Sequence, residues 1–181
     1  MQVDKYSASL STLESEELES TALSADVYLR LLAIYLYENK LANAKLLWMR
    51  IPNNLKEQSK ELVQLNQLNL ALQHNRFADF FKHIRYDWSA DIRPIIDDLL
   101  CKQREELFTL TASAYVSIYE QNLMEMAQMS AEELQLYTAD WTRERDGDRP
   151  ILLPKVKEAA PRLANDDQLL KLTEFVSFLE N

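Results

Sequence analysis

Glycine is almost absent from this chain of 181 residues, in which Gly147 is the single example. A domain of this size ordinarily holds about a dozen glycines. Folds built from strands and tight turns need glycine for backbone conformations with positive φ, so we predict a mainly α-helical fold. Phosphate-binding loops need several glycines so that backbone amides can approach the ligand. A single glycine therefore excludes the common nucleotide-binding loops.

Cysteine and histidine are also scarce, since Cys101 is the one thiol and His74 and His83 are the two imidazoles. One cysteine cannot form an internal disulfide, and the paired-histidine patterns of zinc proteases are missing. Cys101 would act as a nucleophile only beside a histidine in space, and we interpret it instead as a small core residue next to Leu99 and Leu100. We therefore predict no metal, no cofactor, no small-molecule substrate and no enzyme activity.

Positively charged residues are fewer than negatively charged ones: the chain has 20 Lys and Arg and 29 Asp and Glu, which gives a net charge of −9. Such a surface repels nucleic acid. The sequence has no leader-like start and no apolar run near the ~20 residues that span a bilayer. We expect no nucleic-acid partner, no membrane contact and an intracellular, soluble protein. The hydrophobic fraction of 47% is sufficient for a folded core.

Three charged clusters are candidates for chemistry or binding. Two of them are the acidic pairs Asp97 with Asp98 and Glu105 with Glu106. Neighbours in sequence point to different faces of a helix, so a solvated surface is the better interpretation of both pairs. The third is the basic group of Lys82, His83 and Arg85. It is too small for a nucleic-acid footprint and suits an acidic protein partner.

Residues 25–114 carry apolar side chains at helical spacing and predict an array of helices. Val27, Leu31, Ile34 and Tyr35 recur at steps of three and four residues, as one helix face requires. Further predicted helices cover residues 41–50, 55–73, 77–84 and 91–110, with Pro52 ending the first and Pro94 in the first turn of the last. Residues 1–24 predict a short helix, with Leu10, Leu13 and Leu18 at loosely helical spacing, and then a frayed linker. We interpret the tryptophans as core side chains: Trp48, Trp88 and Trp141.

An internal repeat lies inside this array. The segment 39–44 recurs as 75–80, an offset of 36 residues, and both copies begin with asparagine. Asparagine tolerates the left-handed conformation that ends many helices, so each copy predicts a helix end, a turn and a second helix. A period in the mid-thirties with two helices per unit is typical of tetratricopeptide-like hairpins.

Residues 115–155 predict a winged helix that contains a β-hairpin. Residues 115–119 are rich in β-branched and aromatic side chains and predict a strand, followed by a helix over residues 122–129. Ser130 and Glu133 form a capping-box pattern that starts a helix ending near Tyr137. Asp146 and Gly147 then favour a tight hairpin turn between residues 141–143 and 151–153.

We expect this module to bind protein rather than DNA. Its second helix carries Glu132 and Glu133 and has no Lys or Arg before Arg143, so phosphates would be repelled. The hairpin is expected to lie at a sheet edge, where free backbone groups pair with a neighbouring winged helix. The partner-binding residues predicted here are Trp141, Ile151 and Leu152. A winged-helix transcription regulator stays open as an alternative of another class.

The C-terminal segment predicts a linker over residues 156–164 and a final helix over residues 165–181. Its apolar side chains cover most of the helix circumference, whereas a helix that serves one domain needs a single stripe. We therefore expect this helix to pack against other chains. The partner-binding residues predicted in it are Leu169, Leu172, Phe175, Val176 and Leu179.

Helical repeats, a winged helix and a tail helix together resemble the PCI-domain family of the proteasome lid, the COP nine signalosome and initiation factor three. Three stretches are more specific and resemble the family of signalosome subunit eight, the smallest subunit. These stretches are residues 27–36 with 43–52, residues 114–118 with 152–154, and residues 168–181.

The resemblance implies a non-catalytic scaffold in a hetero-oligomer that removes NEDD-eight from cullin–RING ubiquitin ligases through a zinc metalloprotease in another subunit. It implies that winged helices pair edge to edge, that tail helices gather in a bundle, and that subunit three is the neighbour. It also implies a cytoplasmic and nuclear location. The corresponding small subunit of the proteasome lid or of initiation factor three stays open as an alternative.

Overall fold

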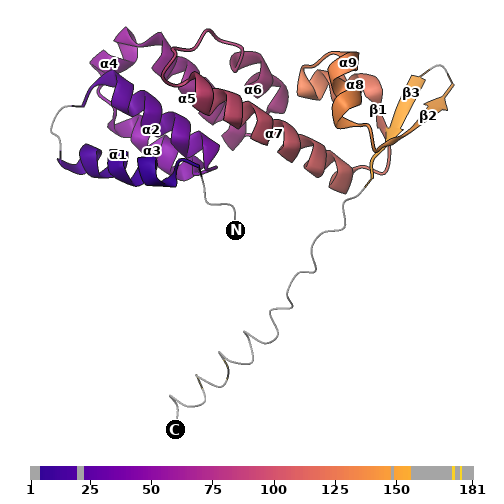
Figure 1. The fold of residues 1–181 in the computed structure, drawn as a ribbon, viewed down its shortest axis with the longest axis horizontal. Helices are drawn as coiled ribbons and strands as arrows, with labels where there is room; N and C mark the ends of the chain where they lie inside the picture. The colour runs from indigo at the N-terminus through magenta and orange to yellow at the C-terminus, as the bar shows by residue number, and fades with distance from the viewer. Residues whose placement is uncertain (1–4, 20–22, 148, 156–172, 174–175, 177–181) are drawn as a thin grey trace.

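The computed structural model describes residues 5–19, 23–147, 149–155, 173 and 176 (Figure 1). The array of helices predicted from the sequence is present, and the mainly α-helical fold class is confirmed. Its helices are α1 Ser7–Glu19, α2 Ala25–Tyr37, α3 Leu41–Arg50, α4 Asn53–Gln58, α5 Lys60–Gln73, α6 Phe77–His83 and α7 Arg93–Ala114. The module that follows contains β1 Ile118–Tyr119, α8 Glu120–Ala127, α9 Ala131–Tyr137, β2 Thr142–Asp146 and β3 Arg149–Leu153.

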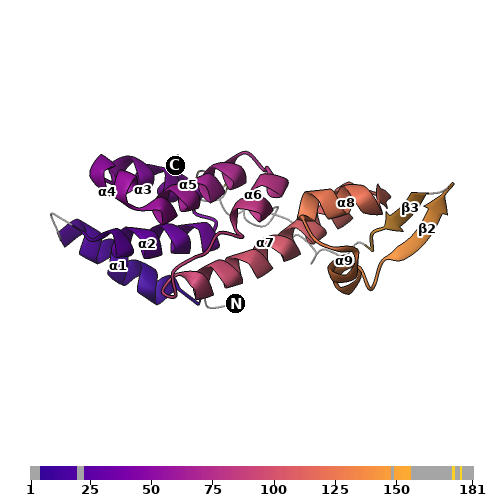
Figure 2. The same ribbon diagram turned by 90° about the horizontal axis from the view of Figure 1, so that it is seen from above.

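Helix α2 is the centre of the array. Its residues 31–36 are all buried, with no more than 4% of any of them exposed. Helices α1, α3, α5 and α7 pack around it, which explains why consecutive side chains on every face are enclosed. The 22-residue helix α7 then extends from the array to the winged-helix module in both views (Figures 1 and 2).

The internal repeat corresponds to two helical hairpins, α2–α3 and α5–α6. Asn39 and Asn75 are left-handed, with φ of 59° and 52°. In the first copy the amide of Lys40 donates to the Tyr35 carbonyl over 2.9 Å, and in the second the amide of Arg76 donates to the Ala71 carbonyl over 2.8 Å. These are the hydrogen bonds of a Schellman helix end. The predicted turn chemistry is therefore confirmed in both copies.

The single helix predicted over residues 55–73 is wrong, because α4 and α5 are separate. Ser59 between them is extended, with φ of −104° and ψ of 103°. Its hydroxyl accepts a hydrogen bond from the Leu62 amide at 3.4 Å, so Ser59 is the N-cap of α5. The prediction for α7 is confirmed in its main feature, since Pro94 occupies the first turn.

Helix α1 is a structural part of the array. Of the three predicted apolar positions, Leu10 is 3% exposed and inserts into the core, Leu13 is partly buried against it, and Leu18 is 87% exposed. Polar contacts complete the attachment. Tyr35 donates to Glu14 over 2.8 Å, and Arg50 donates to both carboxylate oxygens of Glu17 over 2.9 and 2.8 Å.

The winged-helix module follows the predicted order of strand, two helices and a hairpin. The first strand is shorter than predicted, because only Ile118 and Tyr119 pair with β3. The capping box is confirmed, with Ser130 and Glu133 each accepting the other's backbone amide. Gly147 in the hairpin turn has φ of 61°, a conformation that favours glycine.

The predicted linker and tail helix lie outside the described residues, except for Thr173 and Val176. Both of these residues have helical backbone, and Val176 is 52% exposed. Partner binding by the tail therefore stays a prediction. Within the described part of the chain, no helix is both long enough and apolar enough to span a membrane.

Candidate partner interface

The sheet of the winged-helix module offers a free edge at β2. The strand order is β1–β3–β2, so β3 is central and β2 pairs with β3 through one of its edges. All five residues of β2 are exposed, and no strand covers its other edge among the residues that the structure describes. Both views place this hairpin at the end of the molecule, away from the array (Figures 1 and 2). A partner strand can therefore approach β2 without displacing a helix.

The expectation that Leu152 lies on a sheet edge is wrong. Leu152 lies on the central strand, opposite Ile118 of β1 and Arg143 of β2. Its side chain is fully buried, as is nearly all of Ile118. The cause is topological: β1, a strand of two residues, occupies the side of β3 that the hairpin leaves free. The Leu152 side chain therefore packs inside the winged-helix module and does not face a partner.

Ile151 and Trp141 are placed differently from Leu152. Ile151 is half-buried and lies between Tyr119 and Glu144 on the opposite face of the sheet. Trp141 is also half-buried and packs edge-on against Phe108 of α7, with ring centroids 6.1 Å apart. Both side chains keep accessible surface, so their contact with a partner stays a prediction.

Charge alternates along β2, which gives the edge two different faces. Arg143 and Arg145 point to one side, while Glu144 and Asp146 point to the other. The Asp146 carboxylate accepts a hydrogen bond from Tyr119 at 3.0 Å, which fixes it over the sheet. A charged edge discourages pairing with an arbitrary strand, because a partner must present matching charges on both faces.

Helix α9 occupies the position of the DNA-reading helix of a winged helix but carries the wrong charge. Glu132 and Glu133 are exposed in its first turn, and Leu134 is buried beneath them. The helix contains neither lysine nor arginine. Phosphate groups would meet two carboxylates and no cation, so the surface favours contact with protein.

Three exposed apolar side chains, two on α9 and one in the connection from α7 to β1, were not predicted from the sequence. Leu136 is 79% exposed on α9, and Val116 is 87% exposed in the connection from α7 to β1. Tyr137 stacks on Phe108 with ring centroids 5.0 Å apart and keeps 37% of its surface exposed. The sequence signal was available, because Leu136 follows the buried Leu134 by two residues and must face away from it. Only a contiguous apolar patch marks a contact surface, so partner contact by these side chains stays a prediction.

The prediction that Cys101 is a core residue is wrong. Its side chain is exposed, although Leu99 two residues earlier is fully buried.

The two tryptophans of the helical array, Trp48 and Trp88, differ from each other in burial. Trp88 is 6% exposed and donates to the Ile84 carbonyl over 2.8 Å, which confirms it as core, while Trp48 is half-buried under the ammonium group of Lys56.

The two carboxylates of the acidic pair at Asp97 and Asp98 have different surroundings. Asp97 is exposed, whereas Asp98 accepts hydrogen bonds from both Lys5 and Tyr6 over 2.5 Å. These hydrogen bonds, that of Lys5 being the larger cause, lower the pKa of the Asp98 carboxyl below its ordinary value. Asp98 thus fastens the start of α1 to α7. In the described part of the chain, no group of three metal-binding side chains converges.

The comparisons with known proteins agree on one family. Residues 22–162 match the CSN8/PSMD8/EIF3K family. A relative from Drosophila melanogaster, named COP9 signalosome complex subunit 8, is 61% identical over 183 aligned residues that cover the whole of both chains. Relatives of the same name from Xenopus laevis and Arabidopsis thaliana are 31% and 28% identical and cover 93% and 81% of this chain. The chain therefore belongs to the CSN8/PSMD8/EIF3K family.

Proposed function

We propose that this chain is a non-catalytic scaffold subunit of a COP9 signalosome, in the position that subunit 8 occupies. The observation that carries the proposal is the 61% identity to the Drosophila relative across the full length of both proteins. Loops and surfaces diverge faster than cores, and an identity of 61% exceeds the buried share of the chain, so it extends to surface residues. The free edge of β2 and the exposed side chains near α9 supply surfaces for such contacts.

The finer part of the proposal concerns neighbours and activity. The β2 edge pairs with the winged helix of an adjacent subunit, and subunit three is the neighbour we propose. The tail with Leu169, Leu172 and Phe175 joins a helical bundle with other subunits. The chain supports removal of NEDD-eight from cullin–RING ligases by a metalloprotease subunit and acts in the cytoplasm and the nucleus.

Two alternatives have less support. The family also includes subunits of the proteasome lid and of initiation factor three, so the family match alone does not separate the three assemblies. The relatives named above all carry the signalosome name, which favours the first. A DNA-binding regulator is disfavoured by the acidic first turn of α9.

The test is replacement of the endogenous relative in Drosophila cells with a tagged copy of the full-length chain. Purification through the tag, followed by quantitative mass spectrometry, should recover signalosome subunits in equal amounts, subunit three among them. The purified complex should remove NEDD-eight from a cullin, whereas the isolated chain should not. Recovery of lid or initiation-factor subunits in their place would overturn the proposal.

A further inference from the structure

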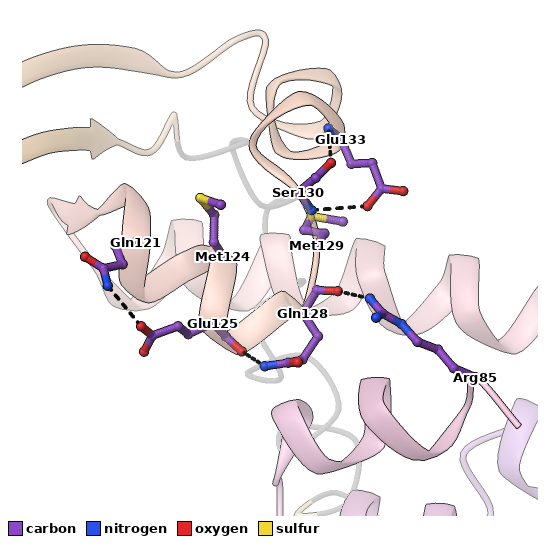
Figure 3. Close-up of a pocket in the computed structure, with 8 residues that line it drawn as sticks. All are labelled: Arg85, Gln121, Met124, Glu125, Gln128, Met129, Ser130 and Glu133. Atoms are coloured by element: carbon purple, nitrogen blue, oxygen red, sulfur yellow. Dashed lines mark hydrogen bonds between the residues drawn. The ribbon is translucent and has the colours of Figure 1, made fainter.

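A groove lies where the end of the helical array meets the winged helix (Figure 3). It has a volume of about 620 Å³ and is lined by Arg85, which follows α6, and by residues of α8, α9 and the turn between them. Helices α6 and α8 pack together here, so the groove follows a junction between two modules. Clefts at such junctions are common binding sites.

The walls of the groove are held in place by Arg85. Its guanidinium group donates to the carbonyl of Gln128, the residue that ends α8 (Figure 3). Gln128 is left-handed with φ of 49°, and its side chain donates to the Glu125 carbonyl over 2.8 Å. Hydrogen bonds to its main chain and from its side chain therefore hold Gln128 in the turn between α8 and α9.

The lining combines methionine with carboxylates. Met129 is 6% exposed and Met124 is half-buried, so their thioethers form the apolar part. Methionine is flexible and polarizable, and surfaces built from it adapt to different apolar side chains. Glu125 and Glu133 are exposed beside them. Among the described residues that line the groove, Arg85 is the one cation, and its guanidinium group is bonded to the Gln128 carbonyl. The groove therefore presents an apolar strip with an excess of negative charge.

We propose that this groove docks a segment of a partner protein that carries an apolar side chain between basic residues. The apolar side chain packs against Met124 and Met129, and lysine or arginine on either side faces Glu125 and Glu133. Acidic peptides and nucleic acids are excluded by the same carboxylates. The groove is separate from the β2 edge, since both views place α8 between α6 and the hairpin (Figures 1 and 2). The inference therefore goes beyond the proposed function and adds a second contact to it.

The experiment uses the full-length chain with carbon-13 in the methionine methyl groups. It is titrated with three short synthetic peptides: one with leucine between lysines, one with leucine between glutamates, and one with alanine between lysines. We expect the methyl signals of Met124 and Met129 to shift with the first peptide only. Met49 on α3, 65% exposed and outside the groove, is the internal reference and should not move.

Charge is tested by the double variant E125Q/E133Q, in which the carboxamide introduced at position 133 can still accept the capping hydrogen bond. We expect its affinity for the leucine–lysine peptide to fall about threefold to tenfold at low salt. The double variant E105Q/E132Q removes the same charge from exposed carboxylates outside the groove and should bind as the wild type does. Equal binding of the glutamate peptide, an equal shift of Met49, no shift at all, or equal loss in both variants would each overturn the inference.

Discussion

Asn39 and Asn75 adopt the same left-handed conformation at corresponding places in two hairpins, 36 residues apart in the sequence. Each ends the first helix of its hairpin and lets the chain reverse into the second. This conformation costs a residue with a Cβ atom about 1–2 kcal/mol, and the cost is smaller for asparagine because its amide bonds locally. The repeat therefore depends on one residue type at two positions.

We predict that Asn39→Ala lowers the free energy of unfolding by about 1 kcal/mol, whereas Asn39→Gly leaves it unchanged or raises it slightly. For a protein of this size, 1 kcal/mol corresponds to a fall of roughly 2–4 °C in the midpoint of thermal unfolding. Calorimetry of the isolated chain measures both. Asn43→Ala on the exposed face of α3 is the control and should change stability by less than about 0.5 kcal/mol. Equal effects of alanine and glycine at Asn39 would contradict the prediction.

Features decided by local chemistry were predictable from the sequence. The asparagine turns, the capping box of Ser130 and Glu133, and the glycine of the hairpin are all present. Each depends on the conformational preference or hydrogen bonds of one or two residues, which neighbours in space scarcely change. The order of helical array and winged helix was also predicted from such local signals, and the family resemblance agreed with it.

Features decided by packing were not predictable. Residues 55–73 contain neither proline nor glycine, and the local sign of the break is Ser59, an N-cap residue type that also occurs inside helices. On α7, the polar Gln103 is 2% exposed while the apolar Cys101 faces solvent, because the rotation of the helix and not hydropathy decides which residue is inward. The central position of β3 is a matter of topology, and the hairpin sequence specifies only its pairing with β2.

The attachment of α1 should depend on pH through Asp98. The pKa of its carboxyl is lowered in the folded protein, so the ionised form is favoured there. Its contribution is therefore fully present above the unfolded pKa of about 3.9 and is lost as the pH falls through the folded pKa. We predict that hydrogen-exchange protection of the Leu10 amide, bonded to the Tyr6 carbonyl at 2.8 Å, falls severalfold between pH 5 and pH 3, measured in steps of about one pH unit.

Asp98→Asn should remove the share of this pH dependence that Asp98 contributes, because the amide does not ionise in that range. Protection of Leu10 in this variant should be lower than in the wild type at pH of about 5 and should fall less than in the wild type below it, since the carboxylates of Glu14 and Glu17 also hold α1. Asp97→Asn, at the exposed neighbouring position, should behave as the wild type. A wild-type fall that persists unchanged in Asp98→Asn would show that another group controls the attachment.

The free edge of β2 predicts different effects for proline at neighbouring positions. Successive backbone amides of a strand point to opposite edges, so Arg143 and Glu144 direct theirs to opposite sides. Proline removes the amide donor, and it is tolerated only where that donor faces solvent. We predict that one of Arg143→Pro and Glu144→Pro destabilises the hairpin, while the other leaves thermal unfolding nearly unchanged and reduces assembly with the neighbouring subunit.

Assembly is measured by co-purification with the tagged complex, and stability by thermal unfolding of the isolated chain. Arg143→Ala and Glu144→Ala keep the amides and serve as matched controls for loss of the side chain. If neither proline variant separates assembly from stability, the outer edge of β2 is not a pairing edge.

The tail is predicted to be needed for assembly of the complex and not for folding of the isolated chain. Changing Leu172 and Val176 together to aspartate should abolish incorporation into the complex and shift thermal unfolding of the isolated chain by only a few degrees. Each buried apolar side chain contributes ~1.5–3 kcal/mol to an interface before the cost of association, and two charges in their place remain unpaired. Val176 is 52% exposed in the isolated chain, so its substitution should weaken the contact with the partner rather than the fold.

The control replaces Leu46 and Met49, which are 55% and 65% exposed on α3, with aspartate and should still assemble. Unfolding of the isolated chain by the tail variant would instead assign the tail to the core of its own fold.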